Sequence, residues 1–240
     1  HAERRSLHDV KRELREALEV SSRSEASGET VARPVRPASV IAVTSGKGGV
    51  GKTTISINLA VAFARQGLRV AIFDADLGLA NVHILMGLKP RFNVKHLVED
   101  NFRLEDVLTE GPLGIKLISG GQGVRELANL TPRQRRWVLR EIDRLEREVD
   151  VLIVDTGAGI SDNVLRFATY ADDVMVVTTP NIAAAADAYS IIKIILGMEA
   201  GSRIGLIANM ARSPEHGRQV FRRIDGAVRK YLNYELTDWG

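Results

Sequence analysis

The sequence predicts an α/β domain built on a mostly parallel, twisted sheet with helices on both faces. From residue 40 onward, short apolar runs alternate with longer segments of helical periodicity, which is the pattern of parallel strands joined by helices. Several runs are β-branched and apolar at consecutive positions, as is typical of strands covered on both faces. A chain of 240 residues is long enough to bury a sizeable core of this kind.

The expected strands and helices follow one another along the chain. The apolar runs that predict strands are 40–44, 70–73, 115–119, 149–154, 174–178 and 203–208. Helical periodicity predicts helices over 53–66, 131–148, 183–198 and 213–232. Thr131, Pro132 and Gln134 are residue types that cap and open a helix, so they place the start of the second one.

Residues 1–39 differ in composition from the rest and contain no aromatic side chain. Within 7–20, apolar residues recur at spacings of three and four and form one narrow stripe, which predicts a short helix. The polar and proline-containing stretch after it predicts a flexible linker. Two interpretations stay open: a disordered tail, or a segment that folds against a partner.

Composition excludes several classes of protein. The chain has no cysteine, which excludes a disulfide scaffold, a thiolate zinc site and a cysteine-ligated iron–sulfur cluster. Its net charge of +3 is too small to indicate nucleic-acid binding by itself, and no apolar run approaches the roughly 20 residues of a membrane span. Residues 203–230 carry seven Lys or Arg against two Asp or Glu. That segment is either a solvated helix face or a surface that docks a partner or nucleic acid.

A glycine-rich loop follows the first expected strand. Residues 46–53 match G-x-x-x-x-G-K-[ST] between a strand and a helix, the arrangement of a P-loop. Glycines let the backbone wrap phosphate oxygens, and the helix that starts there directs its positive dipole end at the same anion. Lys52 neutralises the β- and γ-phosphates, and the Thr53 hydroxyl can ligate Mg²⁺. The residues expected to bind the nucleotide here are Gly46, Lys47, Gly48, Gly49, Val50, Gly51, Lys52, Thr53 and Thr54.

Acidic residues end two other strands. Asp74 and Asp76 lie two residues apart at the end of the second strand, at the sheet edge where ligands bind in such folds. One carboxylate there can hold a metal-bound water and the other can orient an attacking water. Asp155 ends the run 151–154 in the Walker B form, where the carboxylate reaches Mg²⁺, usually through water. The glycines of 156–159 permit close approach to a γ-phosphate.

Lys47 narrows the class of NTPase. A lysine just after the first glycine cannot easily reach the phosphates that its own loop wraps. The form GKGGVGKT of residues 46–53 resembles the deviant P-loop of the MinD/ParA family of ATPases. The resemblance covers about residues 39–240 and implies that Lys47 reaches across an ATP-sandwiched homodimer to the partner's phosphates, as an arginine finger does elsewhere.

The resemblance implies ATP and Mg²⁺ as the ligands and assigns catalytic roles within the site. Lys47, Lys52 and Asp76 are expected to be catalytic, with Asp76 positioning the hydrolytic water. The residues expected at the metal are Thr53, Asp74 and Asp155, with Asp74 acting from behind the direct ligands.

Two further residues gain expected roles from the resemblance. The N–H of Gly159, in the segment that looks like the family's switch II, is expected to sense the γ-phosphate. Asn209 ends the run 204–208, and the family has a base-contacting Asn at this strand end. A capping or turn role remains the alternative for Asn209.

Several segments look more similar to the FlhG (FleN) branch, which controls flagellar number, than to MinD or ParA. They are 74–82, 118–121, 155–160, 178–180 with 187–189, and 209–211. The resemblance implies a slow, partner-stimulated ATPase whose ATP-driven dimerisation regulates the number or placement of bacterial flagella. A ParA- or MinD-like ATPase acting in DNA partition or division-site positioning is the alternative.

The same resemblance implies partners and a location. An FlhF-type GTPase and flagellar C-ring proteins are the expected partners, and DNA is not expected. The full-length protein is expected in the cytoplasm and reversibly at the membrane, through a C-terminal helix beyond residue 240. A last strand and a base-contacting loop are also expected only beyond that point. Residues 9–15 keep Asp9, Leu14 and Arg15 of a GTPase-activating motif but lack its Gln and Ala, so they are either a diverged activator or a coincidence.

We therefore expect two parts: an N-terminal helix with a flexible linker at 1–39, and a MinD-like ATPase domain at 40–240 that stops short of its natural end. Asn181 stands where FlhG proteins often carry Glu.

Overall fold

The computed structural model describes residues 38–77, 79–99, 102–121, 130–199 and 201–240. The helix expected over 7–20 and the motif at 9–15 lie outside these ranges.

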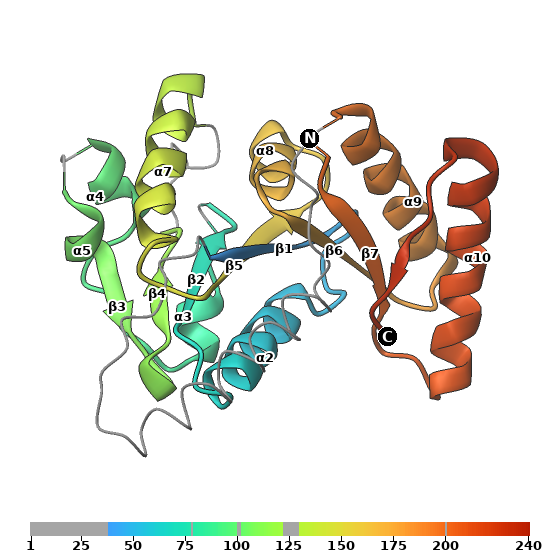
Figure 1. Cartoon of the computed structure of the whole chain (residues 1–240), viewed down its shortest axis with the longest axis horizontal. Coiled ribbons are helices and arrows are strands. Elements are labelled where there is room, and N and C mark those ends of the chain that lie inside the picture. Colours follow the sequence, from blue (N-terminus) through green and yellow to red (C-terminus); the bar gives the residue numbers. More distant parts are fainter. Residues whose placement is uncertain (1–37, 78, 100–101, 122–129, 200) are drawn as a thin grey trace, which may run out of the picture. The chain divides into compact units, whose positions relative to one another are not determined.

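The described residues form an eight-stranded sheet in the order β3-β4-β2-β5-β1-β6-β7-β8 (Figure 1). All neighbouring pairs are parallel except β3 and β4. The strands are β1 Ser39–Ser45, β2 Val70–Ala75, β3 Leu108–Glu110, β4 Lys116–Ile118, β5 Val151–Ala158, β6 Asp173–Thr178, β7 Arg203–Ala208 and β8 Thr237–Asp238. The predicted mostly parallel α/β fold is confirmed, and all six predicted strands are present.

Two short strands were not predicted. β3 is a three-residue antiparallel strand at one edge, too short to show a period. β8 contradicts the expectation that no last strand precedes residue 240, because it pairs with β7 through Gly205 and Leu206. Gly205 makes room for this, since a Cβ there would lie 2.7 Å from the Trp239 ring. A two-residue exposed strand held by backbone pairing leaves no apolar pattern in the sequence.

Helices cover both faces of the sheet. They are α2 Lys52–Ala64, α3 Val82–Leu85, α4 Val94–Glu99, α5 Leu104–Val107, α7 Pro132–Leu145, α8 Asp162–Tyr170, α9 Ile182–Gly197 and α10 Pro214–Leu232, with a 3₁₀ turn at Pro112–Gly114. In Figure 1, α2 lies on one side of the central strands and α7 and α8 lie on the other. The four longest, α2, α7, α9 and α10, were predicted, whereas α8 and the short α3, α4 and α5 were not.

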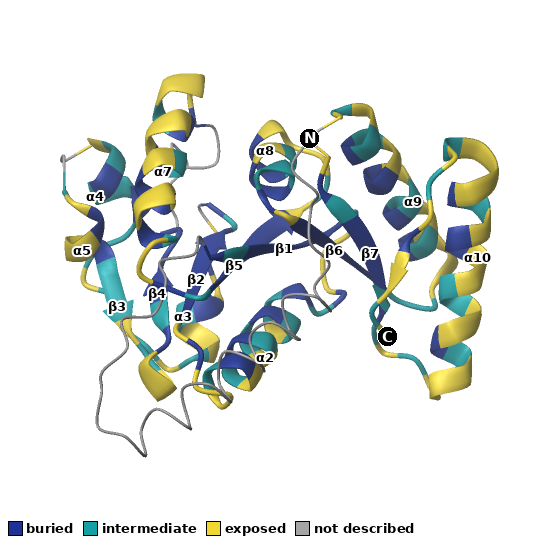
Figure 2. Ribbon diagram, in the orientation of Figure 1, coloured by how far each residue is buried: buried dark blue, intermediate teal, exposed yellow. Residues whose placement is uncertain are grey.

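The core explains why the central strands read as continuous apolar runs. Every residue of β2 is buried, and all of β1 is buried except partly exposed Ser39, because helices pack on both faces (Figure 2). Phe73 of β2 meets Phe167 of α8 edge-on at 5.2 Å between ring centroids. Burying each such side chain stabilises the fold by about 1.5–3 kcal/mol, so this packing fixes where the carboxyl ends of the strands lie.

Candidate nucleotide-binding site

The P-loop joins β1 to α2. Gly49 and Gly51 have φ of 77° and 96°, a left-handed conformation that favours glycine. Gly51 is the N-cap of α2 and makes no side-chain cap, so the first N–H groups of that helix remain available to an anion. Gly46 serves a different purpose, since a Cβ there would lie 2.4 Å from the carbonyl oxygen of Asp187 in α9.

Lys52 is the first residue of α2 and is only 8% exposed. Burial lowers the pKa of its ammonium, and the carboxylates of Asp155 and Asp76 oppose that effect. The lysine is therefore held in a low-dielectric site where its charge is balanced by two acids. Phosphate oxygens would supply the same balance in a complex.

Asp155 lies inside β5 and is 1% exposed. Its carboxylate accepts hydrogen bonds from the hydroxyls of Ser56, at 2.9 Å, and Thr53, both on α2. Burial raises the pKa of Asp155 to about 6, although these two hydrogen bonds and the Lys52 charge each lower it. Ser56 lies one helical turn after Lys52, and no motif in the sequence indicated its contact with Asp155.

The Thr53 hydroxyl and the Asp155 carboxylate fit a magnesium ion. Both are oxygen ligands, and they lie side by side at the start of α2. Among the described residues no group of three acidic or imidazole side chains could hold a metal ion alone. Mg²⁺ commonly takes one or two protein ligands and completes its shell with phosphates and water.

The carboxylate of Asp74 holds the backbone of the loop that follows β2. It accepts N–H groups from Asn81 and Val82, both at 3.0 Å, and from Asp76 at 3.3 Å. It thereby ties the end of β2 to the start of α3. Burial raises its pKa to about 7. Asp74 and Asp155 are partners across the β2–β5 pair, so the two buried acids are neighbours.

Asp76 is half-buried and lies near both Lys52 and switch II, defined here as Thr156–Gly159. A Cβ on Gly157 would lie 3.1 Å from its Oδ1 atom. Burial raises the pKa of Asp76, and Lys52 lowers it. The structure therefore brings Lys52, Asp76 and Asp155 together, and their catalytic and metal-binding roles stay predictions.

Gly159 is already hydrogen-bonded within the protein. Its N–H donates to the carbonyl of Ser45 at 2.9 Å, and its φ is 93°. Ser45 also pairs with Ala158, so switch II continues the β1–β5 ladder. The predicted contact between this N–H and a γ-phosphate requires the Ser45 bond to open.

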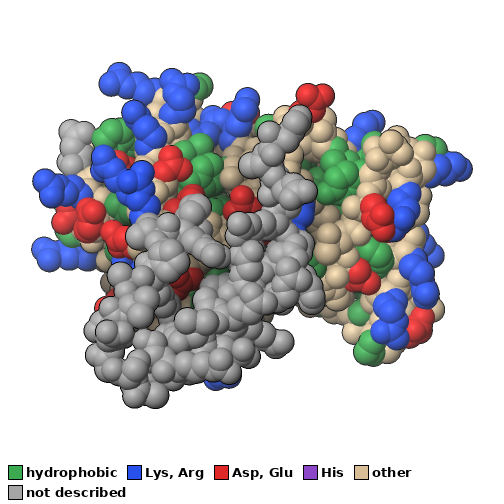
Figure 3. All heavy atoms as spheres, in the orientation of Figure 1, with side chains coloured by type: hydrophobic (Ala, Val, Ile, Leu, Met, Phe, Trp, Pro, Cys, Tyr) green, Lys and Arg blue, Asp and Glu red, His purple; other side chains and the backbone are tan. Residues whose placement is uncertain are grey.

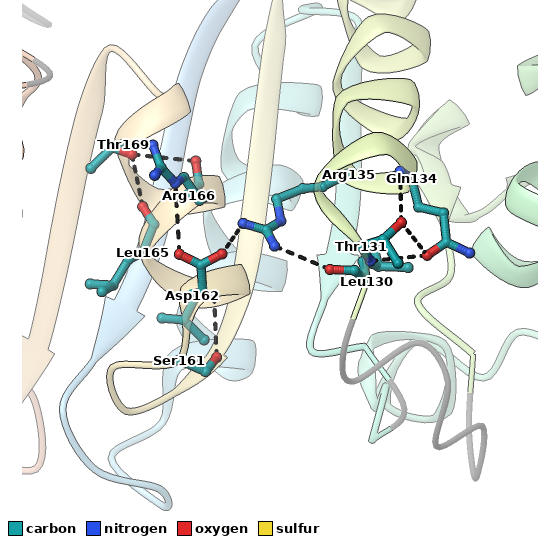
Figure 4. Close-up of polar contacts among 10 residues, drawn as sticks. Leu130, Thr131, Gln134, Arg135, Ser161, Asp162, Leu165, Arg166 and Thr169 are labelled. Atoms are coloured by element: carbon teal, nitrogen blue, oxygen red, sulfur yellow. Dashed lines mark hydrogen bonds and ion pairs between the residues drawn. The ribbon is translucent and has the colours of Figure 1, made fainter.

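The residues after switch II are anchored to α7 (Figure 4). Ser161 caps α8 by accepting the Val164 N–H, and the next residue, Asp162, forms an ion pair with Arg135 of α7. Arg135 also donates to the Leu130 carbonyl at 3.1 Å. The sequence did not predict this contact, because nothing in it separates Arg135 from the exposed arginines beside it.

Lys47 and Asn209 lie on the outer side of the P-loop. Lys47 is exposed. The Asn209 Nδ2 atom donates to the Val50 carbonyl at 2.8 Å, and a Cβ on Gly51 would lie 2.4 Å from that nitrogen. Asn209 thus packs on the loop and keeps its Oδ1 atom as an acceptor. Asn181, at the Glu position of FlhG proteins, caps α9 by accepting the Ala183 N–H at 2.9 Å.

An open groove of about 690 Å³ adjoins this side of the loop. It is lined by the outer P-loop, by the residues after β6 and by the β7–α10 connection. The lining residues are Lys47, Gly48, Gly49, Val50, Thr179, Pro180, Asn181, Ala184, Met210, Arg212 and His216.

The family model for ParA, described as "NUBPL iron-transfer P-loop NTPase", matches residues 36–227. The chain belongs to the ParA/MinD family of P-loop NTPases. The 240 residues contain no cysteine, so none of them could bind an iron–sulfur cluster through a thiolate.

Two bacterial relatives within the family match most of this chain, and the name of one of them refers to the flagellum. The chain is 40% identical to the antiactivator FleN of Pseudomonas aeruginosa over 84% of its own length and 72% of FleN. It is 38% identical to the flagellum site-determining protein YlxH of Helicobacter pylori over 77% of its length. It spans 62% of YlxH, less than two thirds of that relative.

Two solved structures of the family share the fold. MinD of Pyrococcus horikoshii, complexed with Mg-ADP, is 26% identical with a TM-score of 0.66, over 77% of each chain. MinD in the MinC:MinD complex of Aquifex aeolicus is 26% identical with a TM-score of 0.65, over 83% of this chain and 79% of that one. Within the part of this chain that the structure describes, no helix is long and apolar enough to cross a membrane.

Proposed function

We propose that this protein is a Mg²⁺-dependent ATPase whose ATP-driven dimerisation regulates the number or placement of bacterial flagella. One observation carries the proposal. Lys52, Asp76 and Asp155 gather under the P-loop, while Lys47 lies exposed on its outer side, where a second subunit can meet it. The flagellar role is supported by the likeness to FleN and YlxH.

The residues divide the chemistry among them. Magnesium, held through Thr53 and Asp155, would neutralise phosphate charge. Lys52 and the free N–H groups at the start of α2 bind the phosphates. Asp76 orients the attacking water from beside switch II, and Lys47 stabilises the transferred group in the partner's site.

Exposed apolar side chains support a dimer at this face. Leu79, Ile160, Ile182 and Met210 are 69%, 57%, 77% and 61% exposed. They follow the carboxyl ends of β2, β5, β6 and β7, and therefore lie at the same sheet edge as the P-loop. Apolar groups gathered around a charged site favour a second protein surface over open water.

The wider biology belongs to the same proposal. We propose slow, partner-stimulated turnover, with an FlhF-type GTPase and flagellar C-ring proteins as partners. We also propose a cytoplasmic protein that reaches the membrane reversibly through a C-terminal helix of the full-length chain. The likeness to MinD of the MinC:MinD complex supports regulation through a protein partner.

Light scattering coupled to size exclusion tests the proposal. The protein should elute as a dimer with a non-hydrolysable ATP analogue and as a monomer with ADP. Lys47→Ala should keep nucleotide binding and lose hydrolysis. A chain that stays monomeric with the analogue, together with a Lys47→Ala variant of full ATPase activity, would sink the idea. A form extended beyond residue 240 is the control for weak nucleotide binding.

DNA partition is the alternative function, and the basic segment 203–230 is the observation that keeps it open. Four of its seven Lys and Arg side chains form ion pairs within the protein, and one of these four is Arg203, which pairs with Asp173. Arg218 and Arg222 pair with Glu215, and Arg229 pairs with Asp225 and Glu235. Such pairing favours a solvated helix face over a phosphate-binding surface. ATP-dependent, salt-sensitive retardation of nonspecific duplex DNA would establish the alternative instead.

A further inference from the structure

We propose that the outer face of α7 docks an acidic segment of a partner protein. This surface, called here the α7 arginine face, consists of Arg133, Arg136, Trp137 and Arg140. The partner segment places an apolar side chain against Trp137 and its carboxylates on the arginines around it. The α7 arginine face contributes no residue to the candidate nucleotide site, so the proposal does not depend on the proposed ATPase function.

The geometry of α7 separates this face from the core. Its four residues recur at spacings of three and four, so they lie on one side of the helix, and all four are exposed. The opposite side is buried through Val138, Ile142 and Leu145. Arg135 also points away from the face, toward Asp162 of α8 (Figure 4). Lys and Arg side chains gather over α7 in Figure 3.

The charge of this face is not neutralised by the protein around it. Within the ranges that the structure describes, its three arginines form no ion pair with a carboxylate. The acids of α7 are engaged elsewhere. Buried Glu141 pairs with Arg144 at 3.0 Å, and Asp143 accepts a hydrogen bond from the Tyr170 hydroxyl. Three positive charges therefore remain on one exposed side of the helix.

This arrangement destabilises the helix that carries it. Arg136 lies three residues after Arg133 and four before Arg140, and like charges at these spacings oppose helix formation. Arg133 also lies in the first turn, which contains no acid and where the helix dipole disfavours a cation. An anionic partner would relieve both effects. Local costs that nothing inside the protein offsets are typical of a functional surface.

Trp137 favours a protein as the anionic partner. Its Nε1–H donates to the Leu97 carbonyl of α4 at 3.2 Å, so its polar atom is satisfied and its exposed part is apolar. Arg140 lies over the ring, 5.3 Å from its centroid, so that face of the ring is not open to a stacking base. A fixed tryptophan among arginines has the composition of a protein–protein hot spot, and a guanidinium can donate two parallel N–H groups to one carboxylate.

Fluorescence anisotropy with a labelled acidic peptide tests the proposal. The probe repeats Glu-Glu-Leu-Glu over about 14 residues, the length of α7, and a peptide with Gln at every Glu is its control. The wild type should bind the acidic peptide alone, and more weakly as salt rises. Combining Arg136→Gln with Arg140→Gln should weaken this binding about tenfold or more. Combining Arg218→Gln with Arg222→Gln removes the same charge from α10, where both pair with Glu215, and should leave it unchanged.

Trp137 gives a second readout, since Trp239 is the other tryptophan of the chain. The peptide should change the tryptophan fluorescence of the wild type but not that of Trp137→Phe. A wild type that does not bind the peptide, equal weakening in the two double variants, or a fluorescence change that persists in Trp137→Phe would each overturn the proposal. So would DNA or an anionic lipid vesicle that binds through Arg136 and Arg140 more tightly than the peptide does, because the face would then be a phosphate-binding surface.

Discussion

The buried carboxyl group of Asp155 should make the nucleotide-free protein less stable as the pH rises. Folding raises the pKa of Asp155 from 3.8 to about 6. The native state then binds this proton more tightly than the unfolded state does. The stabilisation of the native state by this tighter proton binding is fully present below pH 3.8 and is lost as the pH rises through about 6. A rise of this size corresponds to about 3 kcal/mol at pH 8.

Asp155→Asn removes this dependence and keeps the acceptor for the Thr53 and Ser56 hydroxyls. Lys52 loses part of its charge balance in the variant, which reduces the gain. We therefore expect Asp155→Asn to be more stable than the wild type at pH 8 by about 1–3 kcal/mol, and to have little or no advantage at pH 4.

Urea unfolding at several pH values between 4 and 8, without nucleotide, measures the difference. Burial raises the pKa of Asp74 in both proteins, whereas the Asp155 charge raises it further in the wild type alone, so Asp74 adds to the expected difference in the same direction. Glu105→Gln, at an exposed carboxylate of α5, is the control and should follow the wild type. The reasoning is refuted if the wild type and Asp155→Asn lose the same stability between pH 4 and pH 8.

Three further substitutions test the geometry around the loop. Gly46→Ala should destabilise the protein by about 1–3 kcal/mol in thermal unfolding, because its Cβ would meet the α9 backbone at 2.4 Å; Gly48→Ala, with nothing within 4 Å, should be close to neutral. Asn209→Ala should cost about 1–2 kcal/mol in urea unfolding, since a P-loop carbonyl loses its donor; Asn209→Asp, which cannot donate, should do no better. Asp76→Asn should bind ATP as the wild type does in equilibrium dialysis and release phosphate at least a hundredfold more slowly; unchanged phosphate release would remove Asp76 from the mechanism.

The central fold could be predicted because its physics is local. A strand covered on both faces has to be apolar at consecutive positions, as β1, β2 and β5 are. The Thr131–Gln134 capping box, seen in the structure, is likewise complete within four residues. β8 and β3 escaped because partner strands hold them in place, and their own side chains carry no pattern.

The candidate site also contains some residues that the sequence could predict and others that it could not. Residue types at fixed spacing predicted the P-loop and the acids that approach Lys52. The pattern could not show that the Asp74 oxygens are occupied by N–H groups up to eight residues ahead. Nor could it separate Arg135 from the exposed Arg133, Arg136 and Arg140 of the same helix. Figure 3 shows Lys and Arg side chains gathered over α7. That distinction depends on which side of α7 meets Asp162.

The bond from Gly159 to Ser45 joins two segments that are read separately in the sequence. Ser45 is the last residue before the P-loop, and Gly159 is the last residue of switch II. A ligand that accepts the Gly159 N–H breaks its hydrogen bond to Ser45 and removes one hydrogen bond from the β1–β5 pair. Its own hydrogen bond to this N–H must therefore contribute more than the about 1 kcal/mol that is lost. The last hydrogen bond of the β1–β5 pair therefore opens only for a ligand that binds the Gly159 N–H strongly enough. A ligand too short to reach Gly159 leaves it closed, and one that carries a third phosphate has the atoms to open it.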